Sequence, residues 1–86
     1  MRIPSVASRD FWRLYRRLPS DVRRLAAKSY KVWQQDPFHP SLHFKKVGND
    51  LWSVRLGAHH RALGGFHDHR LVWSWIGTHA DYDQML

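Results

Sequence analysis

The sequence predicts an α+β domain in which an N-terminal helical hairpin packs on one face of a four-stranded antiparallel sheet. Two observations predict this fold. The hydrophobic period is helical before the break at Asp36, Pro37 and Pro40, and strand-like after it. Short polar turns then separate four apolar runs, so neighbouring strands must be antiparallel. Since a chain of 86 residues has room for only one such core, we expect a single domain over residues 1–86.

Two amphipathic segments predict the helical hairpin. Ser8 is a candidate N-cap, and apolar residues follow it at helical spacing, at Phe11, Leu14, Tyr15 and Leu18. Pro19 ends this helix, and Ser20 is the candidate cap of the next one. In that second helix a mostly apolar stripe predicts the buried face, at Val22, Leu25, Ala26, Ser29 and Trp33.

Four short runs rich in Val, Leu, Trp and Phe predict the strands, at residues 43–47, 51–56, 61–66 and 71–76. The segments between them are candidate turns, at residues 48–50, 57–59 and 67–69. Residues 2–6 could add a fifth strand at the edge of the sheet. Residues 81–86 could form a last helical turn.

The charge distribution predicts a polyanionic partner. The formal net charge is +7, and the excess lies in residues 1–35, which carry nine basic and two acidic side chains. Residues 36–86 carry five of each. Ten of the cations are Arg, whose planar fork binds phosphate or carboxylate through two hydrogen bonds. The alternative is a solvated basic surface that serves only solubility.

Composition also excludes several function classes. The chain has no Cys, which excludes disulfides, Cys-ligated zinc, thiol redox chemistry and a Cys nucleophile, and which fits a reducing cytoplasm. Charges at Arg2, Arg9 and Asp10 leave no room for the apolar core of a secretory signal. The longest uncharged run, residues 71–80, is about half of what a spanning helix needs. We therefore expect a soluble, cytoplasmic protein with no membrane partner.

Seven histidines raise the question of a metal site, most of all at His67 and His69. These two residues flank Asp68 in a predicted turn, where side chains usually meet solvent, and no third ligand is apparent. We therefore predict no metal site. Gly64 and Gly65 more plausibly permit a bulge or close backbone packing than a phosphate-binding loop.

The register of one predicted hairpin decides where two arginines lie. In the run at residues 51–56, Arg55 alternates with core residues and so faces away from the core. A three-residue turn at residues 57–59 would pair Leu56 with His60 and place Arg55 opposite Arg61, which could hold a phosphate between them. A two-residue turn would instead split the arginines between the two faces. The simplest alternative is that both arginines only solvate the sheet.

The order of these segments resembles that of the RelE/ParE superfamily of type II toxin–antitoxin toxins over nearly the whole chain. The strongest matches are the strand LWSVRLG with the arginine that follows it, and the C-terminal IGTHADYD. The resemblance implies a RelE-like fold, a cognate antitoxin as partner, and no metal or cofactor. It also implies a metal-independent mRNA endoribonuclease that can act on the ribosome.

Carried over by motif, the resemblance marks four candidate catalytic residues: Arg55, Arg61, His79 and Tyr82. Attack of a ribose 2′-hydroxyl on the adjacent phosphate needs a base, an acid and cations, and these residue types meet that need. The resemblance implies RNA contacts from the neighbouring strands and the basic helices, at Lys45, Lys46, His60, Arg13, Arg17, Arg24 and Lys28. Tyr82 or His60 could stack on a base beside the cut.

The chain departs from the superfamily in ways that leave alternatives open. Some relatives use a glutamate as general base, and this chain has no Glu, so the acid and base roles stay unassigned. One alternative function is a ParE-like toxin that binds DNA gyrase and cleaves nothing. Another is a nucleic-acid-binding domain without catalysis. Both toxin hypotheses imply an antitoxin, expected to be acidic, that covers the basic helices or the arginine face.

Overall fold

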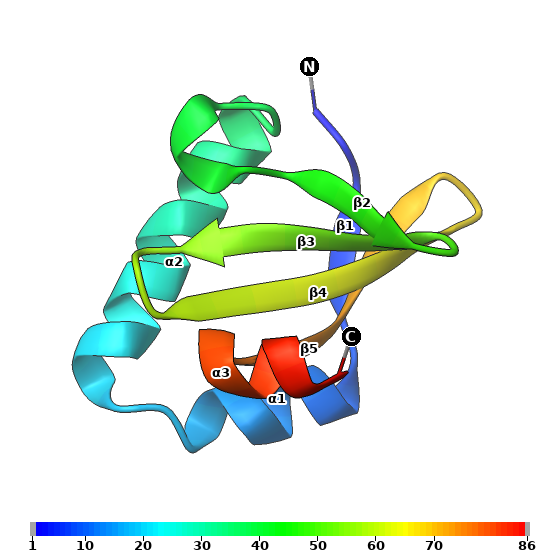
Figure 1. Ribbon diagram of the computed structural model, residues 1–86. Helices are drawn as coiled ribbons and strands as arrows, with labels where there is room; N and C mark the ends of the chain where they lie inside the picture. The colour runs from blue at the N-terminus through cyan, green and yellow to red at the C-terminus, as the bar shows by residue number, and fades with distance from the viewer. Residues whose placement is uncertain (1, 86) are drawn as a thin grey trace.

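The computed structural model describes residues 2–85 and confirms the α+β class (Figure 1). Three helices accompany a five-stranded sheet and one 3₁₀ turn. In chain order the elements are β1 (Ser5–Ala7), α1 (Arg9–Arg16), α2 (Ser20–Gln35), η1 (Pro40–Leu42), β2 (Lys45–Gly48), β3 (Leu51–Leu56), β4 (His60–His67), β5 (Arg70–Thr78) and α3 (His79–Met85).

The sheet has the strand order β1-β5-β4-β3-β2, so the predicted meander of β2 to β5 is confirmed as antiparallel. The fifth strand also forms, but it covers residues 5–7 rather than 2–6 and runs parallel to β5. The sheet is therefore mostly antiparallel, with one parallel pair at its β1 edge. Pro4 has no amide hydrogen, and its carbonyl accepts from the amide of Leu71 at 2.9 Å just before the ladder begins.

Helices α1 and α2 differ in how their N-termini are capped. The Ser8 hydroxyl accepts a hydrogen bond from the amide of Phe11 at 3.2 Å, which confirms Ser8 as the N-cap of α1. The prediction that Ser20 caps α2 was wrong, because Ser20 is already the first helical residue and no side chain caps this end. Pro19 occupies the cap position, and its carbonyl accepts from the amide of Arg23 at 3.0 Å.

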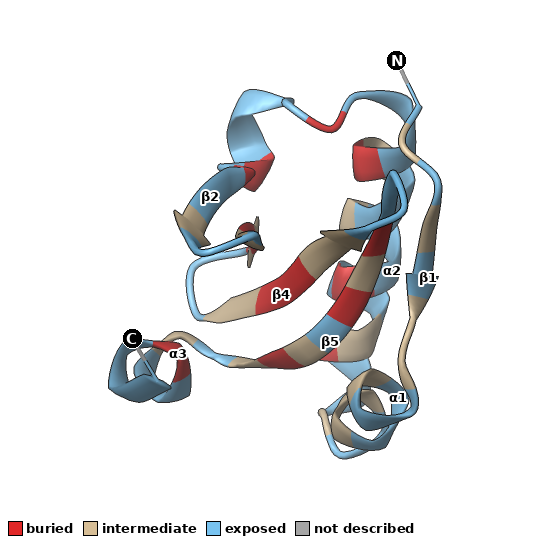
Figure 2. Ribbon diagram, turned by 90° about the vertical axis from the view of Figure 1, so that its right-hand side faces the viewer, coloured by how far each residue is buried: buried red, intermediate tan, exposed pale blue. Residues whose placement is uncertain are grey.

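The main core lies between the sheet and the two N-terminal helices. Trp33 of α2 is 1% exposed and makes edge-to-face contacts with Phe44 and Trp73, with ring centroids 5.7 and 5.2 Å apart. Within α2, Leu25 does not join this core, because its side chain remains 36% exposed. Figure 2 shows α1 and α2 on one side of β4 and β5, and α3 on the other. The sheet is thus covered on both faces, but only lightly on the α3 side.

A bulge interrupts the pairing of β4 with β5 between Leu63 and Gly64. A Cβ atom on Gly64 would lie 2.9 Å from the carbonyl oxygen of Val72, so only glycine fits at this close approach. The prediction that Gly64 serves a bulge or close packing is therefore confirmed.

The C-terminal helix begins earlier than the sequence predicts. It starts at His79 rather than at residue 81, because the Thr78 hydroxyl accepts from the amide of Asp81 at 3.1 Å and acts as a cap. Residue 86 of the predicted turn lies outside the described residues. Among residues 2–85, no helix is both long enough and apolar enough to cross a bilayer.

Candidate functional site

The two arginines of the β3–β4 hairpin stand directly opposite each other. Leu56 pairs with His60 and Arg55 with Arg61, so the register that a three-residue turn predicts is confirmed. Gly57 permits this turn, because its φ of +67° lies in the left-handed region. Neighbouring residues in both strands belong to the core on the α2 side, so Arg55 and Arg61 face the opposite side of the sheet.

The backbone and a buried serine hold both guanidinium groups. Arg55 Nε donates to the carbonyl of Gly57 at 3.0 Å. Arg61 Nη1 donates to the hydroxyl of Ser53 at 3.3 Å, and Ser53 itself is fully buried. Arg61 Nε is buried and has no hydrogen-bond partner within residues 2–85. One N–H group of each arginine is therefore held in place, while the remaining Nη groups can donate hydrogen bonds to a ligand.

The C-terminal helix adds an aromatic ring and an imidazole to this face. The Tyr82 ring lies over the Arg61 guanidinium, with Cζ 5.0 Å from the ring centroid, which is cation–π geometry. The ring of His79 is next to Tyr82, with centroids 5.9 Å apart. We call the group Arg55, Arg61, His79 and Tyr82 the arginine face. All four sequence-predicted catalytic residues thus lie in one region.

A carboxylate orients the imidazole of His79. Its Nδ1 is 3.0 Å from Asp83 Oδ2, an i,i+4 pair on α3, and its backbone amide donates to the carbonyl of His59 at 2.7 Å. With Nδ1 occupied by Asp83, Nε2 is the ring nitrogen left to exchange protons with a ligand. Sequence reasoning missed Asp83 because it began the helix too late for the i,i+4 spacing to be visible. It missed Ser53 too, although Ser53 and Arg55 share one face of the strand.

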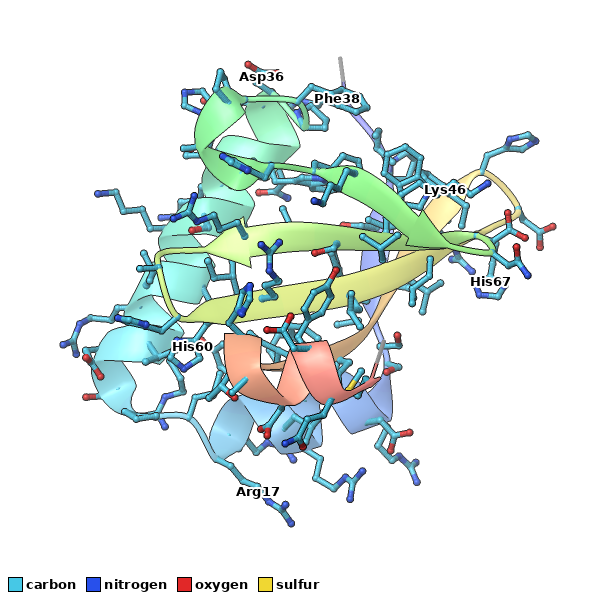
Figure 3. The ribbon with its side chains drawn as sticks, viewed as in Figure 1. Arg17, Asp36, Phe38, Lys46, His60 and His67 are labelled. Atoms are coloured by element: carbon cyan, nitrogen blue, oxygen red, sulfur yellow. The ribbon has the colours of Figure 1, made fainter. Side chains whose placement is uncertain are left out.

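The predicted RNA-binding residues of β2 and β4 are divided between the two faces. Lys45 pairs with Ser53 and therefore lies on the same side as the arginine face. Lys46 pairs with Trp52 and lies on the opposite side, so the two predicted RNA contacts do not share one face of the sheet. His60 pairs with Leu56, whose side chain is in the core, and it likewise alternates away from Arg61. Figure 3 shows His60 at the start of β4, near α3, and Lys46 on β2, farther from α3.

The basic residues of the helices lie on the other side of the sheet from the arginine face. These are the predicted RNA contacts at Arg13, Arg17, Arg24 and Lys28. Arg13 makes an exposed ion pair with Asp10 at 3.4 Å, and Figure 3 shows Arg17 projecting away from the sheet. The structure therefore presents two separate basic surfaces, with the sheet between them.

His67 and His69 lie at the tight turn of the β4–β5 hairpin. Asp68 and His69 form its two central residues, with φ of 53° and 67°, and both are exposed. Within the described residues 2–85, no three His or Asp side chains are placed to hold a metal ion together.

The chain matches a known protein family, and its fold matches several solved structures. A family model described as the ParE-like toxin domain matches residues 20–84. No curated protein matches the sequence significantly. Similar solved structures include the RelBE2 toxin–antitoxin complex of Mycobacterium tuberculosis, with a TM-score of 0.72 at 13% identity over 91% of this chain and 99% of that one.

Two further structures have the same fold. The RelB–RelE antitoxin–toxin complex of Methanococcus jannaschii has a TM-score of 0.73 at 11% identity, over 94% of this chain and 98% of that one. A YoeB/ParE toxin of Agrobacterium tumefaciens has a TM-score of 0.66 at 18% identity, over 88% and 98%. At these identities the likeness concerns the fold.

Proposed function

The chain belongs to the family of ParE-like toxin domains, toxins of type II toxin–antitoxin systems, and on this premise we propose that it is an mRNA endoribonuclease. In this proposal the arginine face binds the scissile phosphate, and no metal ion takes part. The observation that carries it is the direct pairing of Arg55 with Arg61, with Tyr82 over one guanidinium and His79 beside that ring.

The reaction we propose is internal transfer at phosphorus. The ribose 2′-hydroxyl attacks the adjacent phosphate, the bond to the 5′-oxygen breaks, and a 2′,3′-cyclic phosphate and a 5′-hydroxyl result. Arg55 and Arg61 stabilise the extra negative charge of the phosphorane, since their donors are held in place before the reaction. His79 exchanges a proton through Nε2, while Asp83 holds Nδ1. In this proposal His79 takes one of the two proton-transfer roles, base or acid, and Tyr82 is the candidate for the other.

The two basic surfaces suggest two kinds of RNA contact. Lys45 continues the arginine face onto β2 and is placed to hold a backbone phosphate beside the cut. The cations of α1 and α2 face away from the cut, so we assign them to a second RNA segment, such as ribosomal RNA. An acidic antitoxin is the partner we propose to neutralise the toxin.

Sequencing of RNA ends after induction tests this function. We compare the wild type with His79→Ala and Arg61→Ala, and use His69→Ala as the matched control, because His69 is an exposed turn residue remote from the arginine face. New transcript ends and growth arrest should appear with the wild type and His69→Ala and disappear with the other two. Cleavage by the purified protein should persist in a chelator. Transcript cutting that survives both site substitutions would refute the proposal.

One observation favours a second function. The matching family model is named for ParE, whose branch, by the resemblance described above, poisons DNA gyrase. In that case growth arrest should be unchanged by His79→Ala, no transcript ends should appear, and purified gyrase should lose supercoiling activity in the presence of the toxin. The nuclease proposal predicts the opposite for each measurement.

A further inference from the structure

The bulge in β5 turns Trp75 to the opposite face of the sheet from Trp73. Trp73 belongs to the core and is 5% exposed. Regular alternation would place the residue two positions later on the same side, in the core as well. Consecutive residues of β4 pair with Trp75 and Trp73, however, so Ser74 is an extra residue of β5 without a partner in β4. Bulges of this kind re-aim a side chain and are common beside functional sites.

The indole of Trp75 lies on the arginine face, next to Arg61. Gly77 pairs with Arg61, and Trp75 precedes Gly77 by two residues, so the three residues are on one side of the sheet. A Cβ atom on Gly77 would lie 2.6 Å from Cζ2 of Trp75. The ring therefore occupies the space that a side chain at position 77 would take. Because position 77 is a glycine, the indole can lie beside the strand position of Arg61.

Neither Tyr82 nor His60 offers a free ring to a base on the arginine face. Tyr82 is 8% exposed, and the Arg61 guanidinium covers one face of its ring. His60 alternates to the other side of the sheet. Trp75 is partly exposed, and among the Phe, Trp and Tyr residues of the described chain its ring alone makes no contact with another aromatic ring. The base-stacking role considered for Tyr82 or His60 therefore fits Trp75 better.

From these observations we infer that Trp75 stacks on the base of the nucleotide next to the phosphate that Arg55 and Arg61 bind. The ligand is single-stranded RNA, because unpaired bases expose their ring faces to aromatic side chains. Such stacking depends little on which base it is. Trp75 therefore aligns the strand with the arginines without specifying a sequence. This inference rests on the proposed function, because it adds a substrate contact to the same site.

The test measures how much one base contributes to binding, with and without Trp75. The ligand is a short, fluorescently labelled DNA strand, which has no 2′-hydroxyl and so cannot undergo the proposed reaction. Matched ligands each lack one base but keep every phosphate. Affinities for the whole protein are measured by anisotropy at one fixed salt concentration, because phosphate contacts depend on salt. The ratio of the affinities for the intact and the abasic ligand gives the contribution of that base.

We expect one position in the strand at which loss of the base weakens binding to the wild type by about tenfold, as for one stacked base. In Trp75→Leu, loss of the same base should change the affinity little, and Trp75→Phe should recover part of the difference. Trp12→Leu is the matched control, because Trp12 is 45% exposed on α1, on the other side of the sheet. It should keep the full tenfold difference. A merely structural role for Trp75 would instead weaken intact and abasic ligands equally.

Gly77→Ala tests the position of the ring without removing it. The new methyl group would collide with the indole, so the ring must shift. The base-dependent difference should therefore fall, whereas the affinity for the abasic ligand should stay close to that of the wild type. Gly48→Ala in β2 is the control, because a Cβ atom there would be 3.9 Å from its nearest neighbour. Circular dichroism checks the fold of every variant, and Gly77→Ala and Trp75→Phe carry the test if Trp75→Leu does not fold.

The inference and the proposed function can fail separately. A base-dependent difference that survives in Trp75→Leu and Gly77→Ala, equal weakening of all ligands, or no binding of the intact strand would each overturn the inference. Base-dependent binding at Trp75 by a wild type that cleaves no RNA would support the inference and refute the proposed function. Cleavage that requires Arg61 and His79, with no base-dependent difference at Trp75, would refute this inference alone.

Discussion

The contact between Arg61 and Tyr82 can be measured by a double-mutant cycle on protein stability. Tyr82→Leu removes the ring, Arg61→Met removes the charge, and the double variant removes both. The guanidinium carbon lies 5.0 Å from the ring centroid, Tyr82 is 8% exposed and Arg61 is partly buried. Such contacts give about 0.5–1 kcal/mol when exposed and about 2 when desolvated, so we expect a coupling free energy of about 1 kcal/mol.

Urea denaturation followed by circular dichroism gives the free energy of unfolding of each variant, and the cycle isolates the pair. The loss of the hydrogen bond to Ser53 cancels, because Arg61→Met occurs on both sides of the cycle. The matched control pairs Arg55→Met with Tyr82→Leu. Arg55 Nε donates to the Gly57 carbonyl, so this second cycle should be additive to within about 0.5 kcal/mol. A coupling no larger in the first cycle than in the control would refute the reasoning that α3 is held over Arg61.

Three further predictions follow from individual contacts. Ser8→Ala should destabilise the protein by about 1 kcal/mol in a urea titration, whereas Ser20→Ala should have almost no effect, because only Ser8 caps a helix. Asp83→Asn should lower the rate of RNA cleavage without lowering the melting temperature greatly, while Asp81→Asn, whose side chain does not contact His79, should cleave normally. Arg55→Thr should keep or slightly raise the melting temperature while abolishing cleavage; a clear fall in stability would show that this arginine has a structural role.

Most of the fold could be predicted from the sequence because local signals and tertiary packing agree. Alternating apolar residues and short turns specified the meander, and the three-residue turn fixed its register. The predictions that were wrong concerned helix ends, where single residues decide where the helix begins. Thr78 caps α3, so this helix starts two residues before the predicted start, and a proline at the cap position displaced Ser20 from that role. The parallel pairing of β1 could not be read from the sequence, because nothing in a three-residue strand specifies which neighbour it joins.

The sequence predicted the central residues of the candidate site but not how the residues around them are arranged. Strand alternation, a local rule, places Arg55 on the open face, whereas the pairing with Arg61 depends on the turn length, which the sequence left open. The same rule places Lys45 and Lys46 on opposite faces of the sheet, but the prediction grouped the two lysines by charge alone. The basic helices lie on the other face because their apolar stripes must meet the core, which turns their cations outward. Net charge thus predicted a polyanionic partner without showing that the cations form two surfaces.

The pairing of two arginines is itself informative about the site. Like charges directly opposite each other on neighbouring strands destabilise a sheet. This sheet tolerates them because each guanidinium has its own support: the Gly57 carbonyl for Arg55, and the Ser53 hydroxyl with the Tyr82 ring for Arg61. Support of this kind fixes the donors but neutralises neither charge, so a bound anion would relieve the repulsion. A sequence selected for stability alone has no reason to keep this pair, whereas a phosphate-binding face does.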